Sequence, residues 1–187
     1  MARTASAMRG QILESALRLF SVHGFRGTSL QDIASDAGCS KASLLYHFAS
    51  KETILTELLT PARDALATLL DRVAGLERGR LVEETVIGYV DLALRFRREI
   101  RLLFEDIAEM SCHQTLNVLE LADGLLDALA GHSRRAPSRV AAWMVLGAVF
   151  ITSATEDEVA PDEVLRAEMI RSALRTLDHS PQCAADA

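Results

Sequence analysis

The chain has 187 residues, of which 49% are hydrophobic and 25% charged, so it can bury a substantial core as one domain or as a small and a larger part. Its three cysteines include no close pair, which argues against a disulfide framework and a cysteine-rich metal site, and we expect no metal and no cofactor. No N-terminal signal is visible, and the longest apolar run, 141–151, is too short to cross a membrane, so we expect a cytoplasmic protein without a membrane partner.

The first predicted helix spans about Met8 to His23 and follows a loose arm at residues 1–7. Apolar residues recur along it at helical spacing, as in Ile12, Ala16 and Phe20, and they predict one buried face. Gly24 is expected to end the helix.

Two short helices follow, at about 28–37 and 41–48. Thr28 is a candidate N-cap of the first, with Gln31 three residues later able to complete a capping box. Gly38 supplies a left-handed stop, and Ser40 is a candidate cap of the second helix. Two helices joined by such a tight turn indicate a helix-turn-helix, whose second helix enters the DNA major groove.

The second of these helices is barely two turns long and too short to be stable alone. Leu44, Leu45 and Phe48 are available for packing. The remaining positions are short or polar, and they predict a surface displayed to DNA.

Residues 10–59 resemble the DNA-binding domain of the tetracycline-repressor (TetR) family of regulators. The resemblance is carried by Leu19-Phe20 to Gly24-Phe25, Thr28-Ser29 to Ile33-Ala34, Gly38 to Lys41, Leu44 to Phe48, and Ser50-Lys51-Glu52. It implies a DNA-binding protein that is not an enzyme. The chain departs from the family pattern at Leu45, where an aromatic residue is usual.

Side chains at this helix-turn-helix are expected to divide between phosphate and base contacts. Lys41, Tyr46, His47, Lys51 and the helix N-termini suit phosphate, whereas Ser40, Ala42 and Ser43 suit base edges. The predicted contact residues are Thr28, Ser29, Ser40, Lys41, Ala42, Ser43, Tyr46, His47 and Lys51.

The net charge of −6 is distributed unevenly. Residues 1–52 carry six cations and four acids, whereas the remainder carries 14 cations and 22 acids. The acidic part is therefore expected to face away from DNA. The modest excess of two positive charges near the N-terminus predicts that two copies bind DNA together.

A longer helix is expected from Lys51 to about Leu76, and its apolar stripe keeps its phase across Pro61. We therefore favour one helix kinked at Pro61 over a new helix capped by Thr60. Further helices are predicted at about 80–96, 99–110, 114–130, 138–155 and 162–177. The fold is thus predicted to be all-α, with about nine helices, a DNA-binding domain at 1–52 and a ligand-binding and dimerisation domain at 53–187.

The helix at 138–155 has almost no polar side, so it must be buried on all sides. Its own domain can cover one face, and a second copy is expected to cover the other. With the last helix it predicts a four-helix interface in a homodimer, which the family resemblance also implies. The predicted interface residues are Ala141, Ala142, Leu146, Gly147, Leu165, Met169 and Ala173.

The resemblance also implies a small-molecule effector that changes the separation of the two DNA-binding domains. Aromatic, methionine and histidine residues favour an apolar or aromatic ligand, although such residues also build ordinary cores. The candidate ligand-binding residues are Tyr89, Phe96, Phe104, Met110, His113, Trp143, Met144 and Phe150.

The leading interpretation is a repressor that binds a near-palindromic site on double-stranded DNA as a homodimer and is released by this effector. A DNA-binding dimer without a small ligand is one alternative. A helical small-molecule carrier or enzyme is another, although the chain has no Gly-rich phosphate loop, His-x-x-x-His pair or Gly-x-Ser-x-Gly motif.

Overall fold

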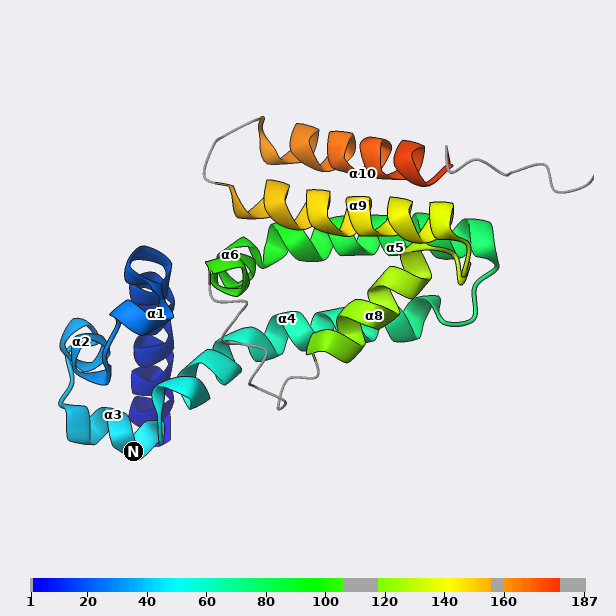
Figure 1. Cartoon of the computed structure of the whole chain (residues 1–187). Helices are drawn as coiled ribbons and strands as arrows, with labels where there is room; N and C mark the ends of the chain where they lie inside the picture. Colours follow the sequence, from blue (N-terminus) through cyan, green and yellow to red (C-terminus); the bar gives the residue numbers. More distant parts are fainter. Residues whose placement is uncertain (1, 106–117, 156–159, 179–187) are drawn as a thin grey trace, which may run out of the picture. The chain divides into compact units, whose positions relative to one another are not determined.

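A computed structural model describes residues 2–105, 118–155 and 160–178. Within these residues the chain forms nine α-helices and no strand, which confirms the predicted all-α class (Figure 1). The helices divide between two compact units. We call Met1–Ala62 with Arg98–Leu116 the head, and Arg63–Arg97 with Asn117–Ala187 the body. The division at residue 52 into a DNA-binding and a ligand-binding domain stays a prediction.

The head is built from α1 (Ala2–Gly27), α2 (Leu30–Asp36), α3 (Lys41–His47), the start of α4 (Lys51–Val73) and most of α6 (Arg97–Glu105). The arm predicted as loose forms the first turns of α1. Each helix contributes to one apolar core that includes the fully buried Ile12, Phe20, Ile33, Leu44 and Ile54, with Leu102 added from α6. This core holds the two short helices in place.

α4 is a single helix that continues through Pro61, as predicted. A proline inside a helix lacks the N–H that would bond the carbonyl four residues earlier. Pro61 lies on the exposed side of α4, where water can satisfy that carbonyl.

The body contains α5 (Arg78–Arg95), α8 (Val118–Leu129), α9 (Ala136–Ala154) and α10 (Asp162–Asp178). α5 packs against α8, α9 and α10, and α9 lies beside α10 (Figure 1). α5 also approaches α4 closely, because a Cβ atom on Gly88 would lie 2.3 Å from Leu69 Cδ1. The predicted bounds of α5, α9 and α10 differ from the observed ones by at most two residues.

The helix α9 extends beyond the apolar run at 141–151, and its 19 residues have a mean hydropathy of 1.3. By length and composition alone it could cross a membrane, which the shorter run did not suggest. Only 28% of this stretch is buried in the protein, so much of its apolar surface is open.

Replacing Gly38 with alanine is expected to destabilise the head by about 1–2 kcal/mol, because Gly38 has a φ of 67° in the turn between α2 and α3. Gly10→Ala is the matched control. Gly10 is helical, and an added Cβ would meet nothing within 4 Å, so this change should stabilise the head by up to about 1 kcal/mol. Urea denaturation at one protein concentration measures both. Equal effects of the two variants would contradict the special role of the turn.

Candidate nucleic-acid interface

The first turn of α2 is fixed by a capping box formed by Ser29 and Asp32. The Ser29 side chain accepts a hydrogen bond from the Asp32 backbone N–H, and the Asp32 carboxylate accepts one from the Ser29 N–H at 2.9 Å. The Ser29 hydroxyl also donates to the Asp32 carboxylate at 2.6 Å, and this bond, followed by the bond from the Ser29 N–H, lowers the pKa of Asp32. The prediction that Thr28 and Gln31 form this cap is wrong, because each capping residue lies one position later in the sequence.

Thr28 instead faces the interior, where only 2% of it is exposed. Its hydroxyl donates to the carbonyl oxygen of Gly24 at 2.9 Å and tightens the end of α1. A hydroxyl buried and bonded in this way is not available to a phosphate. Thr28 is therefore a structural residue here, whereas Ser29 lies exposed beside it.

The helix α3 begins at the predicted cap, because the Ser40 hydroxyl accepts a hydrogen bond from the Ser43 N–H at 3.1 Å. Leu44 is fully buried, which fixes the inner face of α3. Lys41 and Ala42 are exposed, Ser43 is half-buried, and Tyr46 is 85% exposed. The structure thus brings these predicted DNA contacts together on one accessible surface.

Leu45 was expected among the packing residues of α3, but 44% of it is exposed. The core position on each turn of this two-turn helix is already filled by Leu44 and Phe48. Leu45 therefore adds an apolar side chain to the outer surface of α3, next to Tyr46.

Arg9 of α1 holds the end of α3. Its Nη1 donates to the His47 carbonyl oxygen at 2.8 Å, and its Nε donates to the Glu57 carboxylate at 2.9 Å. The guanidinium also lies 4.3 Å from the centre of the Phe48 ring. The pairing with Glu57 joins residues 48 positions apart, and no local pattern marks it.

Lys51, another predicted DNA contact, is also engaged inside the head. Its Nζ donates to the carbonyl oxygens of Phe25 at 2.6 Å and Thr28 at 2.9 Å. It lies 4.2 Å from the centre of the Phe25 ring. The ammonium thus ties the start of α4 to the α1–α2 connection, and the phosphate contact expected of Lys51 stays untested. His47 is half-buried, and its ring lies nearly perpendicular to the Tyr46 ring, with the two ring centres 5.3 Å apart.

The predicted ligand residues do not gather at one described cavity. Tyr89 is 5% exposed, its hydroxyl donates to the Leu146 carbonyl oxygen at 2.9 Å, and burial raises its pKa. Phe96 is buried and Phe150 is half-buried, whereas Trp143 and Met144 are more than half exposed. Phe104 lies in α6, and Met110 and His113 lie outside the described residues.

The predicted dimer residues divide between two faces. Ala141, Ala142, Met169 and Ala173 are at most 8% exposed, and their place in an interface stays a prediction. Leu146, Gly147 and Leu165 are partly exposed. An all-apolar helix carries no polar side to mark its outer face, so the sequence did not reveal which residues point outward.

The open apolar face, as we call it, consists of exposed side chains on α9 with one from α10. They are Val140, Trp143, Met144, Ile151 and Val164. Beside it, a groove of about 320 Å³ runs between α9 and α10. Among the described residues, no group of three or more His, Cys, Asp or Glu side chains could hold a metal.

Comparison with known proteins agrees with this geometry. Residues 12–58 match the family described as bacterial regulatory proteins, tetR family. The repressor KstR2 of Mycobacterium tuberculosis is 39% identical over 87 residues, covering 41% of this chain and 44% of that protein. The regulator RutR of Escherichia coli K12 is 47% identical over 62 residues, covering 33% of this chain and 29% of that protein. The matches thus span less than half the length of these relatives.

Solved structures extend the similarity to most of the chain. The TetR family regulator PfmR from Thermus thermophilus is 26% identical, with a TM-score of 0.68 over 88% of this chain and 97% of that one. AibR, solved with isovaleryl coenzyme A and operator DNA, is 24% identical, with a TM-score of 0.66 over 88% of this chain and 97% of that one. At this identity the similarity to AibR shows a shared fold and no more. The helix-turn-helix segment at residues 12–58 therefore matches the tetR family of bacterial regulatory proteins in sequence, and the fold is shared over most of the chain.

Proposed function

We propose that this protein is a transcriptional repressor that binds a near-palindromic operator as a homodimer through α3. The observation that carries this proposal is the outer surface of α3, where Lys41, Ala42 and Tyr46 are exposed on a helix fixed from behind by Leu44. A tyrosine that is 85% exposed buries little of its ring in its own subunit, and an aromatic ring with a hydroxyl suits a DNA sugar and phosphate.

Specificity is expected to come from several weak contacts. Ala42 is suited to a thymine methyl group, and Ser43 can exchange one hydrogen bond with a base edge. Lys41 is the exposed cation of α3 and is suited to a phosphate. Because neither Ala42 nor Ser43 can form a bidentate base contact, two copies on successive major grooves are needed for useful affinity.

Lys41→Ala is expected to weaken binding to all duplexes alike and to lower the slope of log K against log salt by about two, because one phosphate contact is lost from each of the two heads. Tyr46→Ala is expected to weaken binding about tenfold or more, with folding unchanged. Fluorescence anisotropy with a labelled duplex from the gene's own upstream region, titrated at several salt concentrations, measures both effects. Full affinity in both variants would contradict the assignment of α3.

Lys51→Met separates the internal role of Lys51 from its predicted phosphate contact. Loss of two hydrogen bonds to carbonyls and of the contact with the Phe25 ring should destabilise the head by about 2–4 kcal/mol. Thermal unfolding monitored by circular dichroism measures this loss. If the variant keeps its stability but its DNA affinity depends less steeply on salt, Lys51 contacts phosphate and has no internal role.

The open apolar face supports a homodimer. Val140, Trp143, Met144 and Ile151 follow helical spacing along α9, and each is more than half exposed. An apolar stripe of this length is uncommon on a monomer and typical of an interface. Gly147 lies within the same stretch, and an added Cβ there would meet nothing within 4 Å, so a second helix can approach closely.

A second copy is a better cover for this face than lipid. α9 carries Arg139, whose Nη1 lies 3.7 Å from an Asp127 carboxylate oxygen. Burying such a pair in a bilayer is costly. The remaining faces of α9 already pack on α5, α8 and α10. This arrangement supports the cytoplasmic location expected from the sequence.

Trp143→Glu is expected to convert the dimer to a monomer, because it places a charge at the centre of the interface. Val22→Glu is the matched control, since Val22 is 69% exposed on α1 and outside the open apolar face. Sedimentation velocity measures the mass of each variant. A Trp143→Glu protein that stays dimeric, or a monomeric wild type, would contradict the proposed interface.

We further propose that a small molecule bound by the body releases the operator. The support for this step is the match of residues 12–58 to the tetR family and the presence of cavities in the body. A DNA-binding dimer without a small ligand is the alternative.

A further inference from the structure

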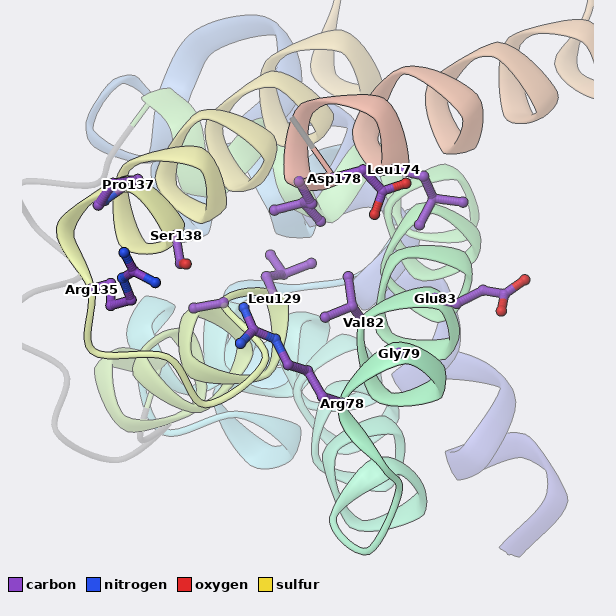
Figure 2. A pocket seen from close by; sticks show the side chains of 12 residues that line it. Arg78, Gly79, Val82, Glu83, Leu129, Arg135, Pro137, Ser138, Leu174 and Asp178 are labelled. Carbon is purple, nitrogen blue, oxygen red and sulfur yellow. The ribbon is translucent and has the colours of Figure 1, made fainter. Parts of the chain in front are cut away.

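A cavity with a volume of about 550 Å³ opens at one end of the body (Figure 2). Four helices line it: the first turns of α5 and α9 and the last turns of α8 and α10. None of the predicted ligand residues lies in it. A volume of this size is typical of small-molecule sites.

Two arginines give the cavity its chemical character. Arg78 comes from α5 and Arg135 precedes α9, and their guanidinium groups lie on the same side of the cavity in Figure 2. Within the part of the chain that the structure describes, neither guanidinium has a hydrogen-bond or ion-pair partner. The stem of Arg78 rests on Gly131, where an added Cβ would lie 2.9 Å from Arg78 Cγ. This close approach restricts where the Arg78 guanidinium can lie.

Two acids also line the cavity, but they do not neutralise the arginines directly. Glu83 points away from Arg78 and Arg135, and Asp178 lies across the cavity beside Leu174 (Figure 2). The side that holds the arginines is therefore electropositive. α5 and α9 have no side-chain cap, so their first free N–H groups add to this potential.

Apolar side chains form one part of the cavity wall. Leu129 is 1% exposed and Ala130 is 3% exposed, and Val82, Leu174 and Leu177 complete this surface. Guanidinium groups bind carboxylate and phosphate oxygens with paired hydrogen bonds. An apolar wall favours a hydrocarbon or aromatic body. The two features together select a ligand that has both parts.

We propose that this cavity binds an organic anion, with an oxyanion head group held by Arg78 and Arg135 and an apolar body against Leu129, Leu174 and Leu177. Ser138, which points into the cavity in Figure 2, is placed to share the head group. The binding step is independent of DNA. Its identification as the effector site rests on the proposed function.

The test uses two fluorescent probes that share an apolar body and differ in charge. 1-Anilinonaphthalene-8-sulfonate carries an oxyanion, and N-phenyl-1-naphthylamine does not. Titration of the full chain, without DNA, should show saturable sulfonate binding. Arg78→Gln and Arg135→Gln should each weaken it by about fivefold to tenfold, because each removes one charge-assisted contact. Binding of the neutral probe should be unchanged. Arg134→Gln is the control, since Arg134 adjoins Arg135 but does not line the cavity.

A second variant tests the location while all charges remain. Ser138→Phe places an apolar ring in the cavity and should weaken sulfonate binding at least fivefold. Circular dichroism confirms that each variant is folded. The proposal fails if the wild type shows no saturable sulfonate binding, if Arg134→Gln weakens it as much as Arg135→Gln, or if Ser138→Phe has no effect. Because no DNA is present, these failures are distinct from a failure to bind the operator.

Discussion

The constraint on which the head depends is that α3 has only seven residues, too few for an isolated helix to be stable. Its geometry must therefore come from tertiary contacts. Leu44 and Phe48 anchor its inner face, Ser40 caps its start, and Arg9 bonds the carbonyl of its last residue, His47. With its inner face and both ends fixed in this way, the outer side of α3 is free for recognition, and the position of Tyr46 is set before DNA arrives.

Several cations of the head already have partners within the head. A count of cations up to Glu52 treats each as available to phosphate, but Arg9, Arg18 and Lys51 are engaged within the head, with Glu57, Asp36 and two backbone carbonyls respectively. Fewer cations are therefore free to contact phosphate directly than the count suggests. This strengthens the argument that a single head binds poorly and that two must act together.

Features that depend on local periodicity and on turn residues were predicted from the sequence. Helical spacing identified the helices, and Gly38 and Ser40 marked the turn of the helix-turn-helix. It did not identify contacts made at long range, such as Arg9 with Glu57, or Lys51 with the Phe25 carbonyl. At α2, two adjacent residues were both good caps, and the choice of Ser29 depends on Asp32 rather than on Gln31. In α9, residues on every side are apolar and do not indicate which face points outward. Ala142 was therefore assigned to the outer face, although it is fully buried.

α9 has to satisfy two demands at once. Its inner side, with Ala142, Val145 and Val149, completes the core of the body, and its outer side remains apolar and open. The cavity with Arg78 and Arg135 is lined by the first turn of α9 and the last turns of α10, the two helices that carry the open apolar face. A ligand in that cavity would therefore contact the elements on which a second copy packs. If both proposals hold, binding at the cavity and association of two copies are linked, and each must change the affinity of the other by the same factor.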